Sequence, residues 1–148
     1  VPVYLFIAGF LLKNHKTDGL WAILFCLASF GISNTLSAEV LKPIFKQERP
    51  CNDPDFNEQV QLRVKCGGGK SFPSAHATNH FALSFYLLII LVRKYKWVIA
   101  PLIIWAALVS YAQVYVGVHY PVDVLVGALL GVLIGVVVGS VFNKVVKL

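Results

Sequence analysis

Long apolar runs are the feature that most limits what this chain can fold into. Five such runs can be distinguished, at residues 1–12, 20–44, 81–92, 97–116 and 122–141. The second, fourth and fifth have the roughly 20 residues that cross about 30 Å of hydrocarbon as a helix. The third reaches that length only if its helix begins near Pro73, and the first is too short to span a membrane alone. The sequence therefore predicts an all-α, polytopic bundle of membrane helices.

Composition agrees with this prediction. Only 14% of the residues are charged, compared with roughly 25% in soluble domains, and the mean hydropathy is +0.72. No soluble segment, heptad run or low-complexity tract is visible, so we predict a single membrane domain over residues 1–148 with an extracytoplasmic loop at about 46–72. Because position 1 is not Met and no basic region precedes the first run, we expect further residues upstream and no removable signal peptide.

Basic residues mark one end of the predicted bundle. They fall in alternate connections and at the end of the chain: Lys13, Lys16, Arg93, Lys94, Lys96, Lys144 and Lys147. Basic connections tend to stay in the cytoplasm, so these ends are predicted to face it, while the mixed charges of residues 46–70 lie outside. The net charge of +6 does not indicate nucleic acid, because no basic face interleaved with aromatic residues is present.

The cysteines are compatible with an outer loop at residues 46–72. Cys51 and Cys66 bracket the middle of that loop, whereas Cys26 lies inside an apolar run. In an oxidising compartment the first two could form a disulfide, but two cysteines without further spacing evidence leave the pairing open.

The last apolar run contains a repeat of small residues. A glycine stands at every fourth position: Gly127, Gly131, Gly135 and Gly139. Such a smooth helix face lets another helix approach closely, and we predict packing within the bundle rather than a dimer seam.

Polar residues cluster near the predicted outer ends of the helices. They come from the segments LKPIFKQERP, SFPSAH and VHYPVD: Lys42, Arg49, Ser74, His76, His119 and Asp123. Each has an ordinary explanation when taken alone, namely a snorkelling cation, a helix cap or a His–Asp pair on one helix face. The predicted topology brings all of them to one level, where helix starts and cations together suit a phosphate group.

The segments KPIFKQERP, PSAH and VYVGVHYPVD closely resemble the three signature segments of the type 2 phosphatidic acid phosphatase family, which includes vanadium-dependent haloperoxidases. The resemblance extends from about Lys42 to about Gly127. It implies a bundle of six membrane spans, of which this chain would hold five, and hydrolysis of a phosphomonoester or diphosphate without a metal or cofactor. A soluble haloperoxidase is excluded by the apolar runs.

The resemblance also implies roles for individual residues. His119 would attack phosphorus, and Asp123 would hold its imidazole in the correct tautomer. His76 would protonate the leaving oxygen and later activate water to hydrolyse the phosphohistidine.

The phosphoryl oxygens would be held by a second group of residues. The matching positions are Lys42, Arg49, Ser74 and the backbone amides near Ala75, which would stabilise the charge that builds up during transfer. We also expect Glu39 to form an ion pair with Lys42 or another cation of the site, because an unpaired carboxylate there is costly.

Gln113 departs from the family pattern, which has arginine at this position. A neutral amide cannot offer phosphate a charge-assisted fork, and loss of one transition-state donor costs about 10²–10³ in rate. Three explanations stay open: a variant made to trap a complex, a natural enzyme with a different phosphate partner, or a degenerate binder.

A site at the outer surface of a membrane bundle suggests a lipid substrate. In a bacterium, the resemblance points to lipid A 1-phosphate, undecaprenyl diphosphate or phosphatidylglycerol phosphate, hydrolysed at the inner (plasma) membrane with the site facing the periplasm or cell exterior. A catalytically weak lipid-phosphate-binding protein is one alternative. A transporter is another, although the internal repeat typical of many transporters is not visible.

Overall fold

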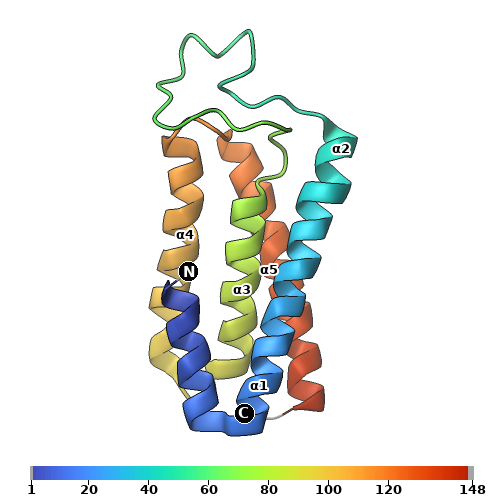
Figure 1. Ribbon diagram of the computed structural model, residues 1–148, viewed down its shortest axis with the longest axis vertical. Helices are drawn as coiled ribbons and strands as arrows, with labels where there is room; N and C mark the ends of the chain where they lie inside the picture. Colours follow the sequence, from blue (N-terminus) through green and yellow to red (C-terminus); the bar gives the residue numbers. More distant parts are fainter. Residues whose placement is uncertain (1, 147–148) are drawn as a thin grey trace.

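The computed structural model describes residues 2–146, all of whose regular structure is helical. The elements in chain order are α1 (Pro2–Asn34), η1 (Thr35–Leu41), α2 (Lys42–Phe45), α3 (Ala75–Leu91), η2 (Lys96–Val98), α4 (Ile99–Tyr115) and α5 (Pro121–Val145). Figure 1 shows the long helices side by side, with an extended loop at one end. The prediction of an all-α bundle is confirmed.

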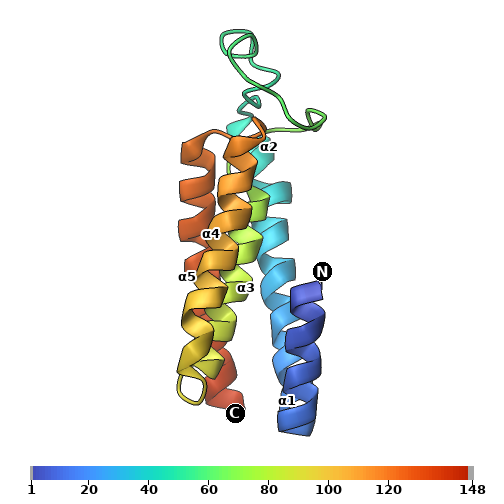
Figure 2. The same cartoon turned by 90° about the vertical axis from the view of Figure 1, so that its left-hand side faces the viewer.

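Helix α1 is folded back on itself. At Lys16 the backbone leaves the helical region, with φ 46° and ψ −116°. The two arms of the helix pack closely directly after this bend. A Cβ on Gly19 would lie only 2.3 Å from the backbone oxygen of Leu11, so the backbones meet at a position without a side chain. Figures 1 and 2 show the two arms running antiparallel, with the start of the first arm part-way up the bundle and the bend at its lower end. The second arm continues through η1 and α2 toward the loop.

Helix α3 lies at the centre and contacts α1, α4 and α5. It begins at Ala75, close to the expected start near Pro73, because the Ser74 side chain caps it by accepting from the backbone N–H of Ala77. Most of its side chains are buried, and the hydroxyl of Tyr86 donates to the carbonyl of Ala22 at 2.7 Å. This bond satisfies a polar group that would otherwise be stranded in an apolar interior.

The glycine face of α5 packs directly on α3. A Cβ on Gly127 would lie 2.6 Å from the backbone oxygen of Ser74, and one on Gly131 would lie 2.4 Å from that of Thr78. Any larger residue would force the helices apart, so the repeat is an internal packing device, as predicted. Because the contact begins at Ser74, it also fixes the height of the α3 N-terminus against that of α5.

The opposite faces of the helices are apolar and exposed. On α5, for example, Leu125, Leu129 and Leu133 are each more than half exposed. A soluble protein rarely exposes so much contiguous apolar surface. By length and composition, three helical segments can cross a membrane, at residues 3–45, 96–115 and 121–145, and α3 is a shorter apolar helix. The chain is a membrane protein, while the prediction of five spans remains a prediction.

The basic connections gather at the end opposite the loop. The α1 bend, the α3–α4 turn and the end of α5 all lie there (Figure 1). Of the seven basic residues in the predicted pattern, Lys147 lies outside the described residues. The charge asymmetry between the two ends therefore exists in the fold.

Candidate active site

The polar residues singled out by the sequence meet at the loop end of the bundle. They come from α2, the loop that follows it, the first turns of α3 and α5, and the turn between α4 and α5. The first turns are held together by the backbone N–H of Ser74, which donates to the carbonyl of Asp123 at 3.0 Å.

His119 and Asp123 form a buried pair at the centre of the site. Nδ1 of His119 lies 3.2 Å from Oδ2 of Asp123, and the two side chains are 2% and 0% exposed. Asp123 stands in the first turn of α5, where its Oδ2 also accepts from the backbone N–H of Tyr120 at 3.0 Å. The start of α5 thus holds the Asp123 carboxylate in place independently of the orientation of the His119 ring.

The contacts of Arg49 indicate which ring nitrogen of His119 carries the proton. Its Nη1 donates to the carbonyl of Val118 at 3.0 Å and lies 3.3 Å from Nε2 of His119. Arginine has no acceptor, so in this contact Nε2 of His119 is the acceptor and the unprotonated nitrogen. The proton then resides on Nδ1 and is donated to Asp123. This is the tautomer that leaves a lone pair on Nε2.

Lys42 reaches the site from the end of a π-helical segment. Its backbone N–H bonds to the carbonyl of Ser37, and its Nζ donates to the carbonyl of Lys70 at 2.8 Å. Such π segments are frequently found at functional sites. The expected ion pair of Glu39 is wrong: among residues 2–146 Glu39 has no such pair, and its side chain is exposed.

Ser74 and Ala75 form the start of α3, with His76 in its first turn. Ser74 is fully buried and serves as the helix cap, while Ala75 is the first helical residue, whose amide has no partner within the helix. His76 is exposed in the bundle and lines a cavity of about 520 Å³ between α1 and α3. The lining of this cavity also includes Tyr4, Cys26, Phe30, Asn34, Asn79 and His80.

One buried residue of the site escaped the sequence analysis. Ser71 is fully buried, donates to Oδ2 of Asp123 and lies 3.3 Å from Nδ1 of His119. In the sequence it is an ordinary loop serine ahead of Pro73, so no spacing or periodicity distinguishes it. The described residues contain no group of three or more His, Cys, Asp or Glu side chains suited to hold a metal ion.

Comparison with known proteins identifies the family. The PAP2 superfamily model matches residues 19–147, which include every residue of the site. The chain belongs to this superfamily. It is 34% identical over 128 residues to a lipid A 4'-phosphatase of Bacteroides thetaiotaomicron, covering 84% of this chain and 56% of the relative. It is 41% identical over 97 residues to an undecaprenyl-diphosphatase of Sulfolobus acidocaldarius, covering 66% of this chain and 44% of the relative.

Solved structures agree with this PAP2 assignment. A PAP2-type phosphatidylglycerolphosphate phosphatase from Bacillus subtilis superimposes with a TM-score of 0.74 at 28% identity, over 97% of this chain and 69% of that one. LpxE of Aquifex aeolicus does so with a TM-score of 0.63, also at 28% identity, over 96% and 76%. The chain spans about half the length of the lipid A 4'-phosphatases that it matches.

Gln113 stands on α4 beside the turn that carries His119 in this PAP2 chain. Its backbone carbonyl accepts from the N–H groups of Val118 and His119, both at 3.2 Å. The residue is half-buried, and within residues 2–146 its side-chain amide makes no hydrogen bond. The backbone at this position therefore shapes the turn, while the side chain is free to meet a ligand.

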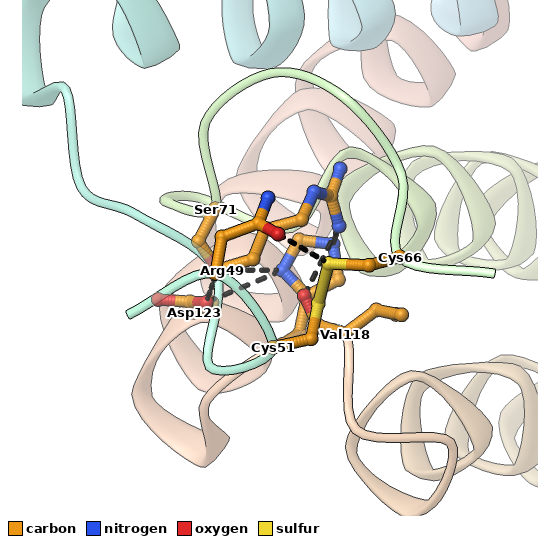
Figure 3. The surroundings of a disulfide bond; sticks show 8 residues. Arg49, Cys51, Cys66, Ser71, Val118 and Asp123 are labelled. Carbon is orange, nitrogen blue, oxygen red and sulfur yellow. Dashed lines mark hydrogen bonds and ion pairs between the residues drawn. A yellow bond between two sulfur atoms is a disulfide. The ribbon is translucent and has the colours of Figure 1, made fainter. Parts of the chain in front are cut away.

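The outer loop is closed by a disulfide between Cys51 and Cys66, whose Cα atoms are 6.0 Å apart. Figure 3 shows Arg49, Ser71 and Asp123 beside this disulfide. Arg49 stands just before the bridged segment and Ser71 just after it. Two residues of the site are thus carried by the flanks of one covalently closed loop.

The charge state of His119 gives a testable pH dependence. Its pKa lies below the ordinary 6.5, chiefly because the ring is buried; the bond to Asp123 opposes this, and Arg49 and Lys42 lower the pKa further. Protons compete for Nε2 only below that pKa, so the acid limb of kcat/KM should lie below pH 6.5. We expect kcat/KM at pH 6.5 to keep more than about half of its value at pH 7.5. An acid limb centred above pH 7 would contradict this.

Proposed function

We propose that this chain is a membrane lipid phosphatase that hydrolyses a lipid phosphomonoester or diphosphate through a phosphohistidine, facing the periplasm or cell exterior. The observation that carries the proposal is the buried His119, with Nδ1 against Asp123 and Nε2 against Arg49. This arrangement provides an oriented nucleophile beside a phosphate-binding cation.

The reaction follows from these positions. The lone pair of Nε2 on His119 attacks phosphorus, and the bond to the lipid oxygen breaks while His76 gives that oxygen a proton. Asp123 stabilises the positive charge on the phosphorylated ring. His76, now a base, takes a proton from water, which attacks phosphorus and releases phosphate and the free ring. Lys42 and Arg49 offset the charge on the phosphoryl oxygens throughout.

The helix starts complete this phosphate-binding arrangement. Ala75 begins α3 next to the nucleophile pair, and its free amide can donate to a phosphoryl oxygen. Ser74 keeps its hydroxyl proton for the same purpose, since in capping the helix its oxygen acts only as an acceptor.

The cavity beside His76 supports a lipid leaving group. The group that leaves must lie on the side of the acid, and this cavity opens between α1 and α3, within the apolar part of the bundle. Its wall is mainly apolar, with the amides of Asn34 and Asn79 joined at 3.2 Å. An acyl or prenyl chain fits such a wall, and the amides can meet the polar part that connects the chain to phosphate.

The relatives suggest which lipids to test. The family resemblance pointed to lipid A 1-phosphate, undecaprenyl diphosphate or phosphatidylglycerol phosphate. Two of the similar proteins are lipid A 4'-phosphatases, others are undecaprenyl-diphosphatases, and one structural neighbour is a phosphatidylglycerolphosphate phosphatase. We therefore propose either phosphate of lipid A, undecaprenyl diphosphate and phosphatidylglycerol phosphate as candidate substrates at the inner membrane.

Phosphate release tests the proposal directly. We expect the purified chain in detergent to release phosphate from at least one of these lipids, and vanadate to inhibit the release because it occupies a phosphate site. The Gln113→Arg form, assayed beside it, should be faster, since a charged fork adds a transition-state donor. An equal or lower rate would make the Gln113 amide the phosphate partner. Vanadate-sensitive binding without release from either form would instead support the weak binder.

A further inference from the structure

Ser71 occupies the space between the two members of the nucleophile pair. It stands in the loop just before α3, and its backbone N–H donates to the carbonyl of Gln47 at 2.7 Å. Its hydroxyl donates to Oδ2 of Asp123 and lies 3.3 Å from Nδ1 of His119. All three side chains are almost fully buried, so water does not substitute for any of these contacts.

The proton count assigns a direction to each contact. A hydroxyl has one proton and two lone pairs. Since the proton of Ser71 goes to Asp123, only a lone pair remains to face Nδ1 of His119. Ser71 is therefore an acceptor toward His119, and it favours a proton on Nδ1 for the same reason that Asp123 does.

The carboxylate of Asp123 is held unevenly. Oδ2 receives Ser71, the ring of His119 and the backbone N–H of Tyr120, while Oδ1 is buried with no hydrogen-bond partner among residues 2–146. Rotation of the carboxylate would exchange a fully bonded oxygen for an unbonded one. Among residues 2–146, the Ser71 hydroxyl and the His119 ring are the donors that reach this oxygen from outside α5 and its cap, and Ser71 opposes that rotation even when the ring moves.

We propose that Ser71 is a positioning residue for the nucleophile, which fixes the Asp123 carboxylate and keeps the His119 ring in its Nδ1-protonated tautomer. The role in turnover rests on the proposed phosphatase function, whereas the effect on the ring does not. In metal sites, where a histidine must likewise be oriented, buried partners of this kind are typically worth about 10–100-fold in activity, and we expect a similar size here.

A measurement on the ring tests the proposal without turnover. In ¹⁵N-labelled protein, two-bond ¹H–¹⁵N spectra of the histidine rings, assigned with His119→Ala, report the tautomer. We expect His119 to be protonated on Nδ1 alone in this chain and in Ser71→Thr, which keeps the hydroxyl, and to populate both tautomers in Ser71→Ala. A His119 ring that stays protonated only on Nδ1 in Ser71→Ala would overturn the proposal, whatever the activity.

Kinetics supply the second test. Ser71→Ala should lower kcat about 10–100-fold with KM nearly unchanged, and Ser71→Thr should recover most of the rate. In an Asp123→Asn background the same alanine change should cost nothing more, because both residues act through one ring. Ser84→Ala is the matched control, since Ser84 is buried on α3 and its hydroxyl has no hydrogen-bond partner among residues 2–146. Equal losses in both backgrounds would show a purely structural role and overturn the proposal.

Discussion

Replacement of His119 by alanine is expected to reduce phosphate release at least about 10⁵-fold, because it removes the group that we propose forms the covalent intermediate. The measurement is single-turnover release from the best lipid of the panel, with KM followed separately. Binding of vanadate should persist, since Lys42 and Arg49 stay in place.

His15→Ala is the matched control for this change. His15 lies next to the α1 bend at the far end of the bundle, where Nε2 is 3.4 Å from the hydroxyl of Tyr95. Its loss should leave the rate within about twofold. Appreciable release by the His119 variant would mean that another group, or water directly, attacks phosphorus.

Replacement of Asp123 by asparagine should have the second largest effect, a loss of about 10⁴ in kcat. The amide has nearly the same shape and can still accept from the backbone N–H of Tyr120, so the α5 cap survives. It can, however, donate to Nδ1 of His119 and so favour the wrong tautomer. It also provides no negative charge to stabilise the phosphorylated ring.

Asp55→Asn controls for the charge change itself. Asp55 is exposed on the outer loop, and its carboxylate lies outside the nucleophile pair. We expect full activity from this variant and an unchanged unfolding temperature from both variants. If Asp123→Asn kept more than about a tenth of the rate, the role of Asp123 as the orienter of His119 would be wrong.

Much of the fold was predictable because membrane helices leave strong signals. Apolar length gave the long helices, and the four-residue glycine repeat predicted a close internal contact that the structure confirms at Gly127 and Gly131. The bend at Lys16 was not predicted as a tight reversal. Its closeness depends on Gly19 meeting the backbone at Leu11, a tertiary contact that no periodicity encodes.

The candidate site shows the same division. Residues from the spaced motifs do meet in the structure: Arg49, for example, lies within hydrogen-bonding distance of His119. Their catalytic roles remain predictions. Ser71 was missed because its importance comes from where the loop returns to the bundle. Glu39 was misjudged because its pairing was argued from the cost of an unpaired carboxylate, whereas its side chain is exposed. It stands in the π-helical segment Thr35–Leu41, in which the neighbours of a residue differ from those in an α-helix.

The disulfide between Cys51 and Cys66 has a consequence for when the site can exist at all. Its closed loop connects the flank that carries Arg49 to the flank that carries Ser71. Closing a loop of this length removes about 3 kcal/mol of chain entropy from the open ensemble. The order of Arg49 and of the Ser71 hydroxyl beside His119 is therefore linked to thiol oxidation. With the loop outside the cytoplasm, as we propose, a newly inserted chain would mature by oxidation there, and the thiol form would hold these two residues less firmly until then.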